Sequence, residues 1–318
     1  MRILYMGTPE IAVAGLEALT RDGQEISAVV TAPDKPAGRG QQMQKSPVKV
    51  FAEKNGLQVM QPADLKSPEF LRALQEIAPE LIVVVAFRML PEEVWSLPPR
   101  GTINLHASML PQYRGAAPIN RVIMNGETET GVSTFFIEKE IDTGRIILQE
   151  PVPIHPDDNA GILHDRIMEK GAGLLIRTIR SLEEGNVKGI LQSDLIGPGT
   201  VLKTAPKIFR EDCRIVWGSP LQSLYDHIRG LSPSPGAWTT LITPEKKNIV
   251  LKVFSAEKLE RDSVYQPGTI LTDGKTRFEV VCQNGILNLM EVQLEGRNKM
   301  GAAELLRGMK DPFAYRLA

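Results

Sequence analysis

The sequence predicts an α/β protein of two domains, a doubly wound and mostly parallel sheet followed by a small β-barrel. Through roughly the first two hundred of its 318 residues, short apolar runs alternate with amphipathic helical patterns, which is typical of a parallel sheet. The remainder carries short strand patterns separated by turn signals, as small barrels do. A chain of this length also exceeds what a single hydrophobic core comfortably fills.

Strands of the first domain are predicted where Val- and Ile-rich runs are bounded by Gly, Pro or Asp. The run Leu81–Ala86 is apolar on both faces, so we expect a central strand that helices cover on each side. The predicted strands are Arg2–Met6, Ile26–Thr31, Leu81–Ala86, Thr102–Leu105 and Gly131–Ile137.

Helices of the first domain are predicted where apolar residues recur at three- and four-residue spacing. Pro68 suits the first turn of one helix, with Ser67 ahead of it as a cap, and Gly185 suits the stop of the last helix. The predicted helices are Ile11–Arg21, Pro47–Asn55, Pro68–Ile77 and Gly161–Glu184.

The boundary between the domains is predicted after residue 203, with a first domain of residues 1–203, linker included, and a second of residues 204–318. The linker segment Asp194–Pro206 is rich in Gly, Pro and Thr and lacks periodicity. In the second domain, Asp273-Gly274 and Asn284-Gly285 indicate tight hairpin turns. A helix and five strands are predicted there: Ser219–Gly230, then Ala237–Ile242, Ile249–Ala256, Gly268–Leu271, Arg277–Val281 and Ile286–Gln293.

Composition and charge favour a cytoplasmic globular protein. Hydrophobic residues make up 42% and charged residues 24%, which are ordinary values for a globular chain. Apolar runs are too short to span a membrane, and the N-terminus begins with a strand pattern instead of a signal peptide. Cys213 and Cys282 are too few for a disulfide framework or a zinc site, so we expect no metal and a reducing compartment. The net charge is −1, and 16 Lys and Arg against 13 Asp and Glu in residues 204–318 are weak evidence for a polyanionic partner.

The residues best suited to chemistry follow the fourth predicted strand, because open α/β sheets bind ligands at the carboxyl ends of their strands. Asn104 and His106 are two residues apart there, so their side chains point to one face. An amide beside an imidazole can stabilise a developing oxyanion and manage a proton. Asn–His pairs are also common as structural features, and these residues alone leave both interpretations open.

Asp142 lies in a turn between two apolar segments, Glu140-Ile141-Asp142-Thr143-Gly144. An aspartate there could face His106 and favour its charged form, or it could simply cap the turn. The first turn of the chain, Met6-Gly7-Thr8-Pro9-Glu10, lacks the spaced glycines of a dinucleotide fingerprint and has no Walker-type lysine. Functions that depend on NAD or ATP are therefore disfavoured.

These segments together resemble the folate-dependent formyltransferases. The pattern Asn-x-His-x-Ser-x-Leu-Pro-x-Tyr-Arg-Gly at Asn104–Gly115, with Ile141-Asp142-Thr143-Gly144 downstream, is similar to the motif of that family. The members that act on methionyl-tRNA are similar over nearly the whole chain. The matching segments outside the motif are Met6–Glu10, Pro33–Gly40, Ser46–Lys49, Arg114–Ile119 and Ala205–Ile208.

The resemblance implies a Rossmann-like catalytic domain, a C-terminal OB-like tRNA-binding domain and the transfer of a one-carbon group. The donor would be 10-formyltetrahydrofolate and the acceptor the α-amino group of methionyl initiator tRNA, giving N-formylmethionyl-tRNA for translation initiation. Carried onto this chain, Asn104, His106 and Asp142 form the catalytic trio. Asn104 and a protonated His106 would stabilise the tetrahedral oxyanion, and Asp142 would help to move the proton off the attacking amine. We expect a monomer that uses no metal and no membrane.

The resemblance also implies two binding surfaces. Residues that follow the third and fourth predicted strands would line the folate site: Ser108, Met109, Leu110, Pro111, Phe87 and Leu90. Cations in and beside the loop Asp34–Val48, and one at the start of the second domain, suit contacts with phosphates. The residues expected to bind tRNA are Arg39, Lys45 and Lys207. Ordinary core packing and solvated loops would also account for these side chains.

Two rival interpretations stay open. Another folate formyl enzyme could act on an amino sugar or a glycinamide ribonucleotide, or hydrolyse the donor, although the glycinamide enzymes lack a second β-domain. A non-catalytic tRNA-binding module could keep a degenerate Rossmann domain, but the intact catalytic trio argues against decay. The chain departs from the family pattern at Arg88, Glu140 and Arg145.

Overall fold

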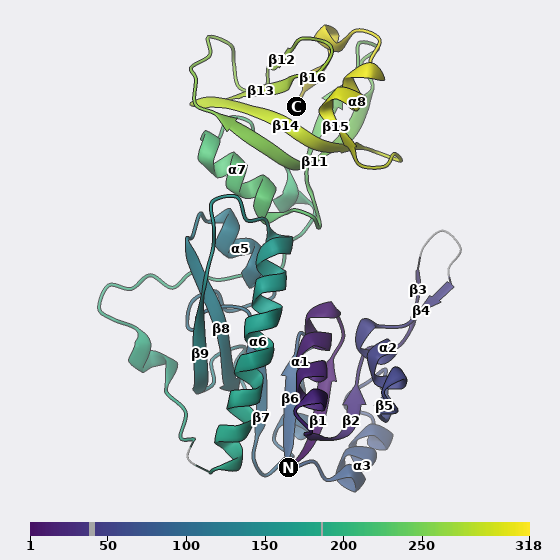
Figure 1. Cartoon of the computed structure of the whole chain (residues 1–318), viewed down its shortest axis with the longest axis vertical. Helices are drawn as coiled ribbons and strands as arrows, with labels where there is room; N and C mark the ends of the chain where they lie inside the picture. The colour runs from purple at the N-terminus through teal and green to yellow at the C-terminus, as the bar shows by residue number, and fades with distance from the viewer. Residues whose placement is uncertain (38–41, 186) are drawn as a thin grey trace. The chain divides into compact units, whose positions relative to one another are not determined.

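The computed structural model describes residues 1–37, 42–185 and 187–318. The chain forms two compact units, which are labelled by their elements in Figure 1. The first unit comprises Met1–Ala116, Glu129–Pro153 and His164–Ala205, and the second comprises Ala117–Thr128, Ile154–Leu163 and Pro206–Ala318.

A seven-stranded sheet in the order β5-β2-β1-β6-β7-β8-β9 forms the first unit. The strands β5, β2, β1, β6 and β7 run parallel to one another, whereas β8 pairs antiparallel with β7 and β9 pairs antiparallel with β8. The predicted mostly parallel sheet is therefore confirmed. Separately, β3 (Lys35–Ala37) pairs with β4 (Gln42–Gln44). The strands of the sheet are β1 (Arg2–Gly7), β2 (Glu25–Val30), β5 (Val59–Met60), β6 (Leu81–Val85), β7 (Thr102–His106), β8 (Glu129–Phe136) and β9 (Ile146–Pro153).

Helices cover both faces of this sheet, because successive residues of its central strands alternate between two apolar cores. Ile3 and Tyr5 share one core with residues of α1, α2 and α6, whereas Leu4 and Met6 share the other with residues of α3 and α4. β6 is buried along its whole length, as predicted for a central strand. Figure 1 shows α1 and α6 on the same side of the strands. The helices are α1 (Glu10–Arg21), α2 (Pro47–Lys54), α3 (Pro68–Ile77), α4 (Glu92–Trp95) and α6 (Ala160–Glu183).

The edge strand β9 lies in a segment for which the sequence predicts no strand. Pro151 and Pro153 interrupt its pattern, and an edge strand tolerates proline because one side of its backbone has no ladder partner. The predicted cap of α3 is confirmed, since the Ser67 side chain accepts a hydrogen bond from the backbone N–H of Phe70. Gly185 follows α6 with a φ of 79°, as expected for a glycine that ends a helix.

The second unit is an antiparallel, nearly closed barrel in the order β12-β13-β14-β11-β10-β16, with β15 paired to β14. Its core gathers apolar residues from these strands and from α7 and α8. Asp273 forms the turn between β12 and β13, because its Oδ1 accepts hydrogen bonds from the N–H groups of residues 275, 276 and 277. The elements are α5 (Pro118–Met124), α7 (Leu221–Gly230), β10 (Ala237–Ile242), β11 (Asn248–Leu259), β12 (Ile270–Thr272), β13 (Phe278–Cys282), β14 (Gly285–Leu294), β15 (Met300–Gly301), α8 (Ala302–Arg307) and β16 (Arg316–Leu317).

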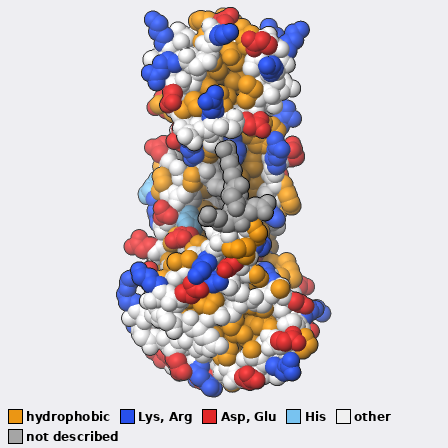
Figure 2. Space-filling view, turned by 90° about the vertical axis from the view of Figure 1, so that its right-hand side faces the viewer, with side chains coloured by type: hydrophobic (Ala, Val, Ile, Leu, Met, Phe, Trp, Pro, Cys, Tyr) orange, Lys and Arg blue, Asp and Glu red, His pale blue; other side chains and the backbone are white. Residues whose placement is uncertain are grey.

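The molecular surface carries both signs of charge. On the face shown in Figure 2, Lys and Arg side chains are interspersed with Asp and Glu, in keeping with the net charge of −1. Across residues 1–37, 42–185 and 187–318, no helix combines the length and the apolar character needed to cross a membrane.

The end of α3 makes a stability prediction possible. Ala78 caps this helix in the left-handed conformation, with φ 45° and ψ 59°, and its side chain is exposed. Ala78→Gly should raise the free energy of unfolding by about 0.5–1 kcal/mol, because glycine lacks the Cβ that is strained there. Urea unfolding followed by circular dichroism measures this change.

The control for Ala78→Gly is Ala73→Gly in the interior of the same helix. There glycine should lower the free energy of unfolding by about 1 kcal/mol, because it only adds conformational entropy to the unfolded chain. If both substitutions destabilise the protein equally, the proposed strain at Ala78 is wrong.

Candidate active site

The end of β7 presents Asn104 and His106 on one face of the sheet. Ile103 faces the opposite side, where it packs in the core with α1 and α6. The Asn104 side chain is partly exposed, and within the described part of the chain its amide makes no hydrogen bond. It is therefore free to donate to a ligand at this strand end.

The His106 ring is buried, with 6% of the residue exposed, and both of its nitrogens face polar groups. Nε2 lies 2.9 Å from the backbone oxygen of Tyr113. Because a carbonyl oxygen can only accept, Nε2 carries the hydrogen of this bond. Nδ1 lies 3.9 Å from Oδ2 of Asp142, which is within ion-pair reach but longer than a hydrogen bond. The structure thus brings together the two side chains that the sequence places 36 residues apart.

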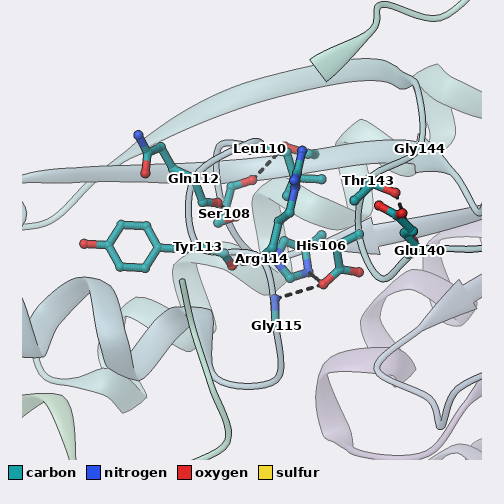
Figure 3. A network of polar contacts seen from close by, with 12 residues as sticks. His106, Ser108, Leu110, Gln112, Tyr113, Arg114, Gly115, Glu140, Thr143 and Gly144 are labelled. Carbon is teal, nitrogen blue, oxygen red and sulfur yellow. Dashed lines mark hydrogen bonds and ion pairs between the residues drawn. The ribbon is translucent and has the colours of Figure 1, made fainter. Parts of the chain in front are cut away.

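Asp142 is held by the loop that follows β7. Its Oδ2 accepts a hydrogen bond of 2.9 Å from the backbone N–H of Gly115, which Figure 3 shows as a dashed line. The Asp142 backbone is left-handed, with a φ of 54°. The same turn needs glycine at position 144, since a Cβ there would lie 1.7 Å from the backbone oxygen of Phe136. Oδ1 of Asp142 has no hydrogen-bond partner among the described residues.

Hydrogen bonds from buried and partly buried side chains shape the loop 108–112. The Ser108 hydroxyl donates to the backbone oxygen of Gln112 at 2.6 Å. On β8, the Ser133 hydroxyl donates to the backbone oxygen of Ser108 at 2.6 Å and accepts from the N–H of Leu110 at 3.1 Å. On β9, the Gln149 amide donates to the backbone oxygen of Leu110 at 2.9 Å. The antiparallel strands therefore fix the loop that the site depends on.

The residues predicted to bind folate lie in two loops at one edge of the sheet, because β6 and β7 are parallel neighbours and end side by side. Ser108, Leu110 and Pro111 are buried, whereas Met109 is partly exposed. In the loop after β6, Phe87 and Leu90 belong to the apolar core formed with α3 and α4, Phe87 at its partly buried rim.

The cations predicted to bind tRNA have different surroundings. Lys45 pairs with Glu53 at 2.7 Å, and the hydrogen bond and charge of that carboxylate raise the pKa of the Lys45 amine. Arg39 lies outside the described residues. Lys207 belongs to the second unit, where its exposed amine lies 5.6 Å from the centre of the Phe209 ring.

Sequence reasoning missed Gln192, Ser133 and Gln149, which support the site through hydrogen bonds. Gln192 belongs to a short 3₁₀ helix, Gln192–Leu195, in a segment without a motif, and the two β-strand residues resemble any polar strand residue. Their partners are far away in sequence, so no local signal marks them.

The three residues that depart from the family pattern are all exposed. Arg88 donates hydrogen bonds to the backbone oxygens of Pro62 and Ala63. Glu140 and Arg145 are exposed on the two sides of the Asp142 turn. In the described ranges no three His, Cys, Asp or Glu side chains cluster in a way that could hold a metal ion.

The fold recurs in solved structures at low sequence identity. HypX from Aquifex aeolicus, in complex with tetrahydrofolic acid, superposes with a TM-score of 0.65 at 18% identity, over 96% of this chain and 47% of that chain. An N-formyltransferase from Helicobacter canadensis, in complex with folinic acid and dTDP-3-aminofucose, gives 0.61 at 20% identity, over 94% and 99%. These likenesses establish the shared fold.

Closer similarity comes from sequence. Residues 1–179 match the formyl transferase family, and residues 207–310 match the C-terminal domain of formyl transferases. The methionyl-tRNA formyltransferase of Bacteroides fragilis is 49% identical over 317 residues, which cover 100% of this chain and 98% of that protein. The methionyl-tRNA formyltransferase of Porphyromonas gingivalis is 44% identical over 97% of this chain and 95% of that protein. The chain belongs to the methionyl-tRNA formyltransferases of the formyl transferase family.

Proposed function

We propose that this chain transfers the formyl group of 10-formyltetrahydrofolate to the α-amino group of methionyl initiator tRNA. The observation that carries the proposal is the arrangement at the end of β7, where His106 faces Asp142 at 3.9 Å and Asn104 lies on the same face. The full-length similarity to methionyl-tRNA formyltransferases supports this acceptor over an amino sugar.

The two loops at the sheet edge fit a folate. A pterin needs an apolar slot with polar groups at its rim, and the loop after β6 leaves Met89 with 72% of its surface exposed beside the packed residues Phe87 and Leu90. Ser108 and Leu110 are turned into the protein, so we assign them to shaping the loop, with its backbone and Met109 lining the folate. When bound, the folate supplies the formyl group as donor.

Asn104 and His106 act on the formyl oxygen. Attack by the methionyl amine forms a C–N bond to the formyl carbon and puts negative charge on that oxygen, and preorganised donors stabilise such charge. Collapse of the tetrahedral intermediate breaks the bond from the formyl carbon to N10 of the folate, and the proton from the amine passes to N10 as tetrahydrofolate leaves. Asn104 offers its free amide N–H groups. Since Nε2 of His106 is held by the backbone oxygen of Tyr113, Nδ1 is the ring nitrogen that faces the reaction.

Asp142 acts on the proton of the amine. One of its oxygens is held by Gly115, which leaves Oδ1 to accept a proton directly or through one water molecule. Its Oδ2 also lies 3.9 Å from Nδ1 of His106, within ion-pair reach of the ring. The same carboxylate therefore serves both the ring and the attacking amine.

The wider setting follows from the acceptor. Initiator tRNA is used in translation, so we assign the protein to the cytoplasm, and we assign it as a monomer, which light scattering at micromolar concentration tests. We assign residues 1–203 to catalysis and residues 204–318 to tRNA binding. Arg39, Lys45 and Lys207 are assigned to phosphate contacts with the tRNA.

An acceptor competition tests the proposed function. Purified protein is given 10-formyltetrahydrofolate with methionyl initiator tRNA, methionyl elongator tRNA and an amino-sugar nucleotide. We expect formylation of the initiator tRNA. Consumption of the donor with the sugar or with water alone would overturn the acceptor.

His106→Ala should lower kcat by about 10²-fold or more, because it removes a donor to the developing oxyanion. The dissociation constant for the folate should change little, since the folate-lining loop does not depend on this side chain for its other hydrogen bonds. Single-turnover formylation and fluorescence titration measure the two quantities. A near-normal kcat would remove His106 from the chemistry.

Lys45→Ala should raise the KM for tRNA and make the slope of log affinity against log salt shallower by about one phosphate contact. Glu53→Gln serves as its matched control, because it releases Lys45 from the ion pair and should lower the KM. Nitrocellulose filter binding across salt concentrations measures both variants. Unchanged slopes in both would show that Lys45 does not touch the RNA.

A further inference from the structure

Gln192 uses its whole side-chain amide in one buried network. Only 2% of the residue is exposed. Its Oε1 accepts from Nε of Arg114 at 3.0 Å and from Nη2 at 2.6 Å. Its Nε2 donates to the backbone oxygens of Asp142 and Gly144, each at 2.8 Å. A primary amide has two donor hydrogens and one oxygen with two lone pairs, so every bonding position is occupied.

These partners fix the orientation of the amide. Turning it over would point the NH₂ group at the guanidinium of Arg114 and the amide oxygen at two carbonyl oxygens, which is unfavourable at all four contacts. A glutamate could keep the contact with Arg114, but its second oxygen would face the carbonyls of Asp142 and Gly144. The network therefore requires an amide at position 192.

The backbone around Gln192 is itself anchored to the sheet. Ile190 and Ile146 form an isolated antiparallel bridge, with N–H to O distances of 2.8 and 2.7 Å in the two directions. Ile146 is the first residue of β9 and lies two residues after Gly144, which ends the turn that carries Asp142. The amide of Gln192 thus extends from a fixed point on the sheet.

The two ends of the amide reach both sides of the His106–Asp142 pair. Arg114 directly precedes Gly115, whose N–H holds Oδ2 of Asp142. On the other side, the bonds to residues 142 and 144 hold a turn in which Asp142 has a φ of 54°. The Asp142 carboxylate joins the two loops directly through Gly115, and Gln192 adds a second connection from a segment outside both loops.

We propose that Gln192 is a positioning residue for the formyl transfer. It bridges the loop 113–115, which holds the oxygen of Asp142 and Nε2 of His106, to the turn 140–144, which carries the Asp142 backbone. In this way it sets the separation of Nδ1 and Oδ2. Because Gln192 touches neither His106 nor the carboxylate of Asp142, it acts only through their supports. This inference rests on the proposed function.

The test is a double-mutant cycle between Gln192→Glu and Asp142→Asn, measured as kcat and KM for both substrates. Gln192→Glu alone should lower kcat by about 10²-fold, since a displacement near 1 Å costs that much in an oriented site. KM for folate and for tRNA should stay within about twofold, because the lost hydrogen bonds orient groups that stabilise the transition state and do not bind the substrates. In the Asp142→Asn background, Gln192→Glu should lower kcat by less than about threefold, because the group it positions is already gone.

Two further variants separate positioning from folding. Gln192→Asn keeps the amide on a shorter side chain and should recover part of kcat, and it replaces Gln192→Glu in the cycle if the glutamate variant fails to fold. Thr178→Val removes a buried hydrogen bond between α6 and Thr134 on β8 in the same unit. It should lower the melting temperature and leave kcat unchanged.

The outcomes are distinct. Additive losses in the cycle, an unchanged kcat in Gln192→Glu, or a loss of kcat in Thr178→Val as large as that in the Gln192 variants would each overturn the positioning role. If the wild-type protein fails to formylate methionyl-tRNA in the same assay, the proposed function fails instead, and the cycle has no reference rate.

Discussion

The register of β7 in the sheet is the constraint on which the site depends. β7 pairs in parallel with β6, so both strands end at the same edge and their loops lie next to each other. It pairs antiparallel with β8, which places His106 opposite Ser133. A slip of one residue would turn Asn104 and His106 toward α1 and α6 and bury two polar side chains in an apolar core. Burial of the apolar core therefore fixes the register that places Asn104 and His106 in the site.

Backbone groups hold the reactive side chains in place. The ring of His106 is oriented by a carbonyl of the loop, and the carboxylate of Asp142 by an N–H of the same loop. The carbonyl belongs to Tyr113, and both Tyr113 and Asp142 have left-handed backbones, with φ of 58° and 54°. Each such residue costs about 1 kcal/mol or more, and the buried hydrogen bonds around them offset the cost. Strain at these two positions means that the rest of the fold determines the site.

The sequence predicts the features of the site that depend on neighbouring residues, and it does not predict contacts between residues far apart in the chain. The period of two in β7 places Asn104 and His106 on one face, and the apolar run of β6 identifies the centre of the sheet. The contact between His106 and Asp142 required the structure, because it depends on how the 113–115 loop closes. β9 was not predicted because its prolines are typical of a loop, although an edge strand tolerates them. Gln192 was missed because its partners lie 48 to 78 residues away.

Charge explains why a neutral residue joins the two loops. Arg114 places a permanent positive charge against Gln192, whose amide also binds the backbone of Asp142, and a glutamate in place of Gln192 would neutralise that charge with a second carboxylate close to the turn. That carboxylate would place a second negative charge near the turn and would repel the carbonyls that it faces. A glutamine instead satisfies the guanidinium with a dipole and adds no charge. Asp142 then remains the anion that faces His106, which is the condition for one carboxylate to serve both the imidazole and the attacking amine.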